Sequence, residues 1–138
     1  MADQKTECLK RVPLFAGLPQ KRLTSLSALI DEVEVAAGET LITQGKAGDT
    51  FYVILVGEVE VRVADRAPGR LGPGEYFGEI SMLDRGPATA TVVTLVPSRM
   101  MVMSHAQFRD AMGANPDLIS SVLASMARRL RENAEISP

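Results

Sequence analysis

The sequence predicts a mainly β protein, an eight-stranded antiparallel jelly-roll barrel with an N-terminal helical segment and two C-terminal helices. The first observation is the spread of glycine: most of the 11 glycines fall between residues 38 and 86. Short runs rich in Val, Ile, Thr, Phe and Tyr lie between these glycines, a pattern typical of a β sandwich or barrel. The second observation is that the segments before and after this region lack such closely spaced glycines and carry apolar residues at helical spacing.

The length fits one domain, because 138 residues can enclose a single hydrophobic core. We expect residues 1–138 to form that domain in three parts. Residues 1–31 are the N-terminal helical segment, residues 32–103 are the β jelly roll, and residues 104–134 are the C-terminal helices.

In two predicted strands, the residue pattern indicates which faces are covered and which are in water. Residues 51–56 are almost continuously apolar, which predicts a strand that is covered on both faces. Residues 59–63 alternate strictly between Val and a charged residue, which predicts a strand with one face in water.

Start signals mark the C-terminal helices. Ser104 and Gln107 have the spacing of a capping box, and Asn115-Pro116 is a second start. Apolar residues follow at helical spacing, which leaves two roles open: the helix packs on the β domain as a lid, or it pairs with a second copy. These residues are Ile119, Val122, Leu123, Met126 and Leu130.

Composition argues against several classes of protein. The net charge of −2, the 4% aromatic content and the lack of Trp argue against a nucleic-acid surface. Cys8 and His105 are the sole residues of their types, so we expect neither a disulfide nor a metal centre. No apolar run approaches the ~20 residues of a membrane span. We therefore expect a cytoplasmic protein.

An enzyme is not expected either. The sequence shows no nucleophile–base pair, metal cluster or carboxylate dyad at useful spacing.

Residues 77–92 have the arrangement of an anion cradle. A glycine turn is followed by Glu79, a short apolar helical stretch, the turn Gly86-Pro87 and then small residues that enter a strand. The start of a helix presents backbone N–H groups without intrahelical acceptors, and such groups suit a phosphate.

Together with other motifs, this cradle resembles the cyclic-nucleotide-binding domain family, which is found in bacterial catabolite activator proteins, protein kinase A regulatory subunits and cyclic-nucleotide-gated channels. The resemblance covers nearly the whole chain. It rests on Gly38-Glu39, Gly45, and the segments 49–54, 57–61 and 77–80. It implies a phosphate-binding cassette at 77–92.

The resemblance also implies roles for individual residues. Gly78 would approach the nucleotide closely, and Glu79 would accept a hydrogen bond from the ribose 2′-hydroxyl. The backbone N–H groups of Ile80 and Ser81 would face the cyclic phosphate, and Thr89 would offer its N–H or hydroxyl. A structural role for Glu79, bonded to the backbone of its own loop, is the alternative.

Ala88 departs from the family pattern, because the residue after the cassette proline is commonly an arginine that pairs with the phosphate. Losing a hydrogen bond to a charged group, worth roughly 1.5–3 kcal/mol, should weaken binding roughly 10- to 150-fold. Natural divergence and replacement of a native arginine are both compatible with Ala88. Arg85 is the nearest cation in the loop, and we interpret it as a solvated loop tip.

The sequence thus predicts a regulatory domain that binds a cyclic nucleotide, with cyclic AMP favoured and cyclic GMP open, and that transmits occupancy through the helix 116–134. The alternative is a ligand-independent module that dimerises or docks an effector protein through the same helix. We expect no direct DNA binding, because no helix-turn-helix fits after this helix. Action on a separate partner and membership of a longer chain both stay open.

Overall fold

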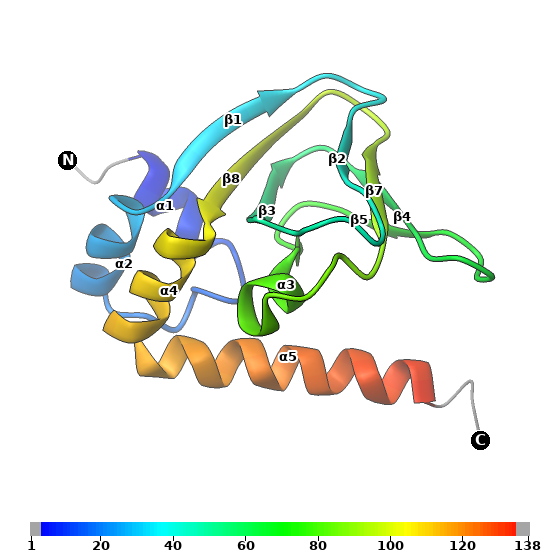
Figure 1. Ribbon diagram of the computed structural model, residues 1–138. Coiled ribbons are helices and arrows are strands. Elements are labelled where there is room, and N and C mark those ends of the chain that lie inside the picture. The colour runs from blue at the N-terminus through cyan, green and yellow to red at the C-terminus, as the bar shows by residue number, and fades with distance from the viewer. Residues whose placement is uncertain (1–3, 135–138) are drawn as a thin grey trace.

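The computed structural model describes residues 4–134 and shows a β domain with helices at both ends (Figure 1). Two helices precede the strands, α1 (Gln4–Lys10) and α2 (Gln20–Ser27). Two follow them, α4 (His105–Ala114) and α5 (Pro116–Ala134). The short helix α3 (Glu79–Asp84) interrupts the β region. The predicted class, mainly β with flanking helices, is confirmed.

The strands form two antiparallel sheets of four. The first has the order β1-β8-β3-β6 and the second has the order β2-β7-β4-β5. Their bounds are β1 Asp31–Val35, β2 Thr40–Ile42, β3 Thr50–Val56, β4 Val59–Arg62, β5 Gly69–Leu71, β6 Tyr76–Phe77, β7 Thr91–Thr94 and β8 Ser98–Ser104.

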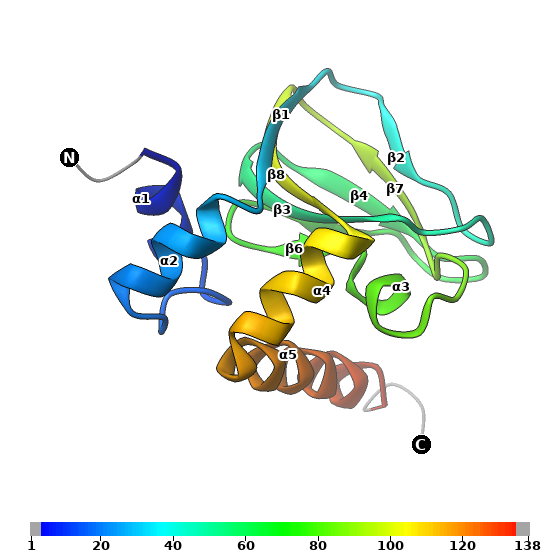
Figure 2. The same cartoon turned by 60° about the vertical axis from the view of Figure 1, so that its left-hand side comes forward.

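The eight predicted strands are therefore present, but the closed barrel is not seen in the described part of the chain. The edge strands β6 and β5 have two and three residues. Strands this short offer few backbone N–H and C=O groups for hydrogen bonds to a strand of the other sheet. The strands therefore remain in two separate sheets. The two sheets face each other in Figure 2.

Strand β3 of the first sheet packs into a core on each face, as the apolar run at 51–56 predicted. Phe51 and Val53 on β3 join the core that the helices complete, whereas Ile54 joins the core between the two sheets. Because side chains alternate along a strand, a strand between two cores needs apolar residues at every position. β4 in the second sheet has its predicted wet face, where Glu60 pairs with Arg62.

The capping box at α4 is confirmed. The Ser104 hydroxyl accepts a hydrogen bond from the Gln107 N–H, and the Gln107 side chain accepts from the Ser104 N–H. Asn115, at the junction of α4 and α5, is buried, and its amide donates to the Ala111 carbonyl. Arg22 of α2 donates to the Ala114 carbonyl. These bonds fix the direction in which α5 leaves α4, and Figure 1 shows that this direction carries α5 beneath α3.

The turn between β3 and β4 generates a stability prediction. Gly57 has φ of +113°, and a Cβ there would lie 2.8 Å from the Ser98 Cα. We expect Gly57→Ala to lower the free energy of unfolding by about 2–4 kcal/mol, because it adds backbone strain and overlap in a packed turn. Urea denaturation measures the loss.

Gly113 in α4 is the matched control. A Cβ at Gly113 would meet nothing within 4 Å, and Gly113→Ala should raise stability by about 0.5–1 kcal/mol because alanine favours a helix. Equal effects at the two positions would contradict the assignment of Gly57 as a constrained turn.

Candidate functional site

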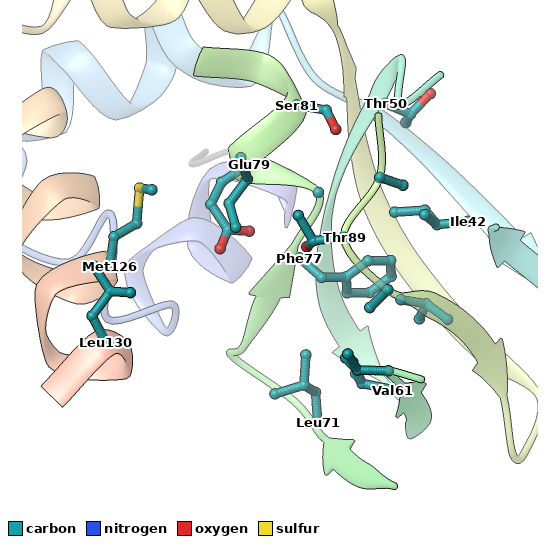
Figure 3. A pocket seen from close by; sticks show the side chains of 17 residues that line it. Ile42, Thr50, Val61, Leu71, Phe77, Glu79, Ser81, Thr89, Met126 and Leu130 are labelled. Atoms are coloured by element: carbon teal, nitrogen blue, oxygen red, sulfur yellow. The ribbon is translucent and has the colours of Figure 1, made fainter. Parts of the chain in front are cut away.

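A pocket of about 310 Å³ lies where α3, the loop after it and α5 meet the second sheet (Figure 3). This volume is at the small end of the range for ligand pockets. Most of its lining is apolar. The lining residues are Ile42, Gly48, Thr50, Val61, Val63, Leu71, Phe77, Gly78, Glu79, Ile80, Ser81, Ala88, Thr89, Ala90, Val92, Met126 and Leu130.

Gly78 shapes the entrance to α3. Its backbone has φ of +90° and ψ of 2°, the left-handed conformation that glycine adopts without a Cβ penalty. A Cβ at this position would lie 2.5 Å from the Thr50 carbonyl oxygen and 3.5 Å from the Phe51 Cα. The chain can therefore leave β6, pass β3 closely and begin α3 at once only with glycine here.

α3 places its first residues in the wall of the pocket. Glu79 is 3% exposed and Ser81 is 4% exposed. In Figure 3 Glu79 lies between Met126 and Leu130 of α5 on one side and Thr89 and Phe77 on the other. A carboxylate held at the start of a helix lies at the positive end of the helix dipole.

Gly48 brings a second loop against α3. A Cβ at Gly48 would lie 2.6 Å from the Cβ of Ser81, so no larger residue fits beside the cassette helix. The loop before β3 and the first turn of α3 thus share one wall of the pocket.

The loop after α3 returns along the same pocket. Ala88 is 7% exposed, Thr89 is exposed, and both line the pocket. The Ala88 N–H donates to the Lys46 carbonyl at 2.8 Å, and the Gly45 N–H donates to the Ala88 carbonyl at 2.9 Å. The backbone of residue 88 is therefore already paired.

The structure brings the predicted site residues together. Gly78, Glu79, Ile80 and Ser81 come from the start of α3, and Ala88 and Thr89 come from the loop that follows it. All of them line this pocket.

Several lining residues were not part of the predicted site. Val61 and Leu71 come from the second sheet, and their apolar character marked them only as core. Met126 and Leu130 come from α5, where helical spacing left the lid and pairing roles open. Because α5 and the cassette are far apart in the sequence, the sequence did not predict that they line the same pocket.

Among the described side chains that line the pocket, Glu79 is the only ionisable one. The nearby cations point elsewhere. Arg85 is exposed, does not line the pocket, and ends α3 in the left-handed conformation with φ of 58°. Arg62 pairs with Glu60. The exposure of Arg85 agrees with its interpretation as a solvated loop tip.

The aromatic residues beside the cassette belong to the cores, as expected. Tyr76 is 6% exposed and Phe77 is 5% exposed. Phe77 stacks on Tyr52, with ring centroids 4.8 Å apart, and burial raises the pKa of the Tyr52 hydroxyl. Phe77 also presents an edge to the pocket, so the core and the site share this side chain.

Within residues 4–134 no three His, Cys, Asp or Glu side chains are grouped so that they could hold a metal ion. None of the helices in that range is long and apolar enough to cross a bilayer.

Comparison with known families gives the class of the protein. The family described as "Cyclic nucleotide-binding domain" matches residues 32–115, which contain the β domain, the cassette and α4. The chain belongs to the cyclic nucleotide-binding domain family. Its fold, cassette and pocket agree with that assignment.

Particular relatives are regulators. The chain is 32% identical, over 132 residues and 91% of its length, to the CRP-like cAMP-activated global transcriptional regulator of Mycobacterium tuberculosis. It spans 58% of the length of that protein. The N-terminal domain of a transcriptional regulator from Streptomyces coelicolor is 33% identical, with a TM-score of 0.69 and coverage of 94% of this chain and 93% of that one.

Two other solved structures share the architecture. The catabolite activator protein of Thermus thermophilus has a TM-score of 0.80 at 28% identity, over 88% of this chain and 60% of that one. A cAMP-bound mutant regulatory subunit of a cAMP-independent protein kinase A from Trypanosoma brucei has a TM-score of 0.74 at 23% identity, over 86% of this chain and 46% of that one. The latter likeness concerns the fold alone.

His105, at the start of α4, generates a pH prediction. Removal from water lowers the pKa of its imidazole, the charges of Arg85 and Arg109 lower it further, and the backbone of Met82 opposes them. The folded chain therefore favours neutral His105. Its contribution to stability is full above the unfolded pKa of about 6.5 and is lost as the pH falls through the lower folded-state value.

We expect His105→Gln to lose less stability than the unaltered chain between about pH 7.5 and about pH 5. Urea denaturation at both pH values measures the difference. His105 is the sole histidine, so its NMR titration is free of overlap. A midpoint above about 6.5 would contradict the prediction.

Proposed function

We propose that this chain binds a cyclic nucleotide, with cyclic AMP favoured and cyclic GMP possible, and reports occupancy through α5. One observation supports this most directly. Both ends of the cassette and the C-terminal half of α5 line the same pocket. A ligand that fills the pocket therefore has to contact the helix that would carry the signal.

Each predicted residue has a role that its position supports. Gly78 allows close approach of backbone and ligand. Glu79, buried at the pocket wall, accepts from the ribose 2′-hydroxyl. The N–H groups of Ile80 and Ser81 face the cyclic phosphate at the start of α3. Thr89, exposed at the opposite edge, offers its hydroxyl to the phosphate or the base.

α5 is the element that would respond. Leu118 and Val122 anchor its first half in the helical core, whereas Leu130 near its end is 67% exposed. A ligand that contacts Met126 and Leu130 would favour a docked helix over a looser one. The shift cannot exceed the ligand's differential affinity for the two states.

Ala88 sets the strength of binding in this proposal. Its methyl group is buried at the pocket wall, and its backbone N–H is already bonded to Lys46. Residue 88 therefore adds no cation and no N–H donor to a phosphate. We propose that the site binds a cyclic nucleotide more weakly than a site with arginine at this position.

Ala88→Arg tests this directly. We expect the variant to bind cyclic AMP roughly 10- to 150-fold more tightly than the unaltered chain, because a charge-assisted hydrogen bond to phosphate is restored. Calorimetric titrations with cyclic AMP and cyclic GMP measure the gain. Ala37→Arg is the matched control, since Ala37 is exposed in the turn between β1 and β2 and lies outside the pocket lining.

Each outcome is informative. Failure of both the unaltered chain and Ala88→Arg to bind either nucleotide below a millimolar would refute the proposed sensor. An equal gain from Ala37→Arg would show general electrostatic attraction and not phosphate pairing. Micromolar binding by the unaltered chain would show that another group replaces the arginine.

Three broader assignments belong to the same proposal. The strand orders β1-β8-β3-β6 and β2-β7-β4-β5 support a jelly-roll topology. A cytoplasmic location and the absence of direct DNA contact by these residues remain predictions. The Mycobacterium tuberculosis relative is a transcriptional regulator, and this chain spans 58% of its length. A role of this chain in transcription is therefore only a proposal.

A second candidate function has its own observation. On α5, Ile119 is 37% exposed, Leu123 is 53% exposed and Leu130 is 67% exposed. With Met126 these side chains follow spacings of four, three and four residues, which matches an a/d seam. This supports the alternative of a module that dimerises through α5 without a ligand.

Leu123→Glu tests dimerisation through α5. If α5 pairs with a second copy, a buried unpaired carboxylate should weaken the dimer at least about tenfold, which light scattering across concentration measures. Ser120→Glu, also exposed on α5, is the control and should change little. A constant monomer mass for the unaltered chain at high concentration would contradict this candidate.

A further inference from the structure

We propose that Lys46 supplies the cation that pairs with the cyclic phosphate in place of an arginine at residue 88. The inference rests on the proposed function and specifies one more residue of the same site. It starts from a charge problem. Among the described side chains that line the pocket the only ionisable one is the acid Glu79, so a bound phosphate would have a carboxylate as its neighbour. A buried like-charge pair without a cation is unfavourable.

The backbone holds Lys46 opposite Ala88. The Ala88 N–H donates to the Lys46 carbonyl, the Gly45 N–H donates to the Ala88 carbonyl, and Ala47 forms an antiparallel bridge with Pro87. Gly45 has φ of +86°. Gly45 and Lys46 both pair with Ala88 on the opposite strand. Two residues opposite one, with a left-handed glycine as the first of the two, are the pattern of a G1 β-bulge. Residues 45–47 and 87–88 thus form a short two-stranded ribbon.

One register argument and one neighbour along the chain place Lys46 beside the pocket wall. Residues opposite each other in an antiparallel pair project from the same face, and Ala88 lines the pocket. Gly48, two residues after Lys46, also lines the pocket, where it lies against Ser81. Both neighbours of Lys46, across and along the chain, are therefore wall residues.

The side chain of Lys46 is available for this role. It is exposed at the rim and is not part of the lining itself. In the described part of the chain no hydrogen bond or ion pair engages its ammonium group. A flexible four-carbon stem lets a lysine ammonium move to an anion as a point charge.

Other described cations are placed less well. Arg85 lies close enough to His105 to lower the pKa of that imidazole, on the α4 side of α3. Arg70 pairs with Glu58. Arg128 and Arg131 are exposed on α5 and do not line the pocket. Lys46 is the cation whose own backbone is bonded to the residue where the family commonly has arginine.

The test is calorimetric titration of cyclic AMP into variants of the chain. We expect Lys46→Gln to weaken binding about five- to tenfold, because a charge-assisted hydrogen bond from an exposed, mobile lysine is lost. Lys46→Arg keeps the charge and should retain affinity. Lys21→Gln, an exposed lysine on α2, is the matched control and should change affinity less than about twofold.

A double-mutant cycle separates a phosphate contact from a structural effect. In the Ala88→Arg background the guanidinium takes the phosphate, so Lys46→Gln should then cost less than about twofold. The same loss in both backgrounds would show that Lys46 supports the loop and would overturn the inference. Circular dichroism confirms that each variant is folded.

The two proposals fail in distinguishable ways. If the unaltered chain binds cyclic AMP and Lys46→Gln binds it equally well, Lys46 is not the pairing cation and the sensor proposal stands. If neither the unaltered chain nor Ala88→Arg binds, both proposals fail. If only Ala88→Arg binds, Lys46 does not replace the arginine. The pocket residues are then in place, but the unaltered chain lacks the affinity to bind.

Discussion

The close approach of Gly78 to the Thr50 carbonyl is the constraint on which the site depends. This contact holds the end of β6 against the start of β3 while the backbone takes a left-handed conformation. The turn places α3 directly after the strand, which buries Glu79 at the pocket wall and points the first helical N–H groups in one direction. A side chain at residue 78 would have to move the central strand of the first sheet.

The position of β3 fixes one side of the site. β3 lies between β8 and β6, with the helical core on one face and the inter-sheet core on the other. The pocket is therefore built from a turn that is fixed by an interior strand and from a loop that is paired to residues 45–47. α5 is different, because its first half is anchored and its second half is exposed. The proposed signal through α5 would use this difference between a paired cradle and a partly anchored helix.

Much of the fold and site could be predicted from local pattern. The glycine spacing indicated eight strands, the continuous apolar run indicated a doubly covered strand, and Ser104 with Gln107 indicated the start of α4. The cassette residues were predicted because they lie close in sequence. The jelly-roll barrel is not confirmed, since the strands form two separate sheets and strand spacing does not reveal how short the edge ladders are. The pocket's other walls were not predicted, because Val61, Leu71 and Met126 look like ordinary core residues.

The sequence by itself determined the family, the cassette and the missing arginine, because each depends on which residues stand next to one another. Only the tertiary structure decided what surrounds Ala88. It paired the backbone of residue 88 with Lys46, brought the charge of Arg85 near His105 and divided the apolar residues of α5 between pocket and surface. The physical reason is that these arrangements bring together residues that lie about 20 positions apart or more in the sequence. Periodicity along the chain does not specify them.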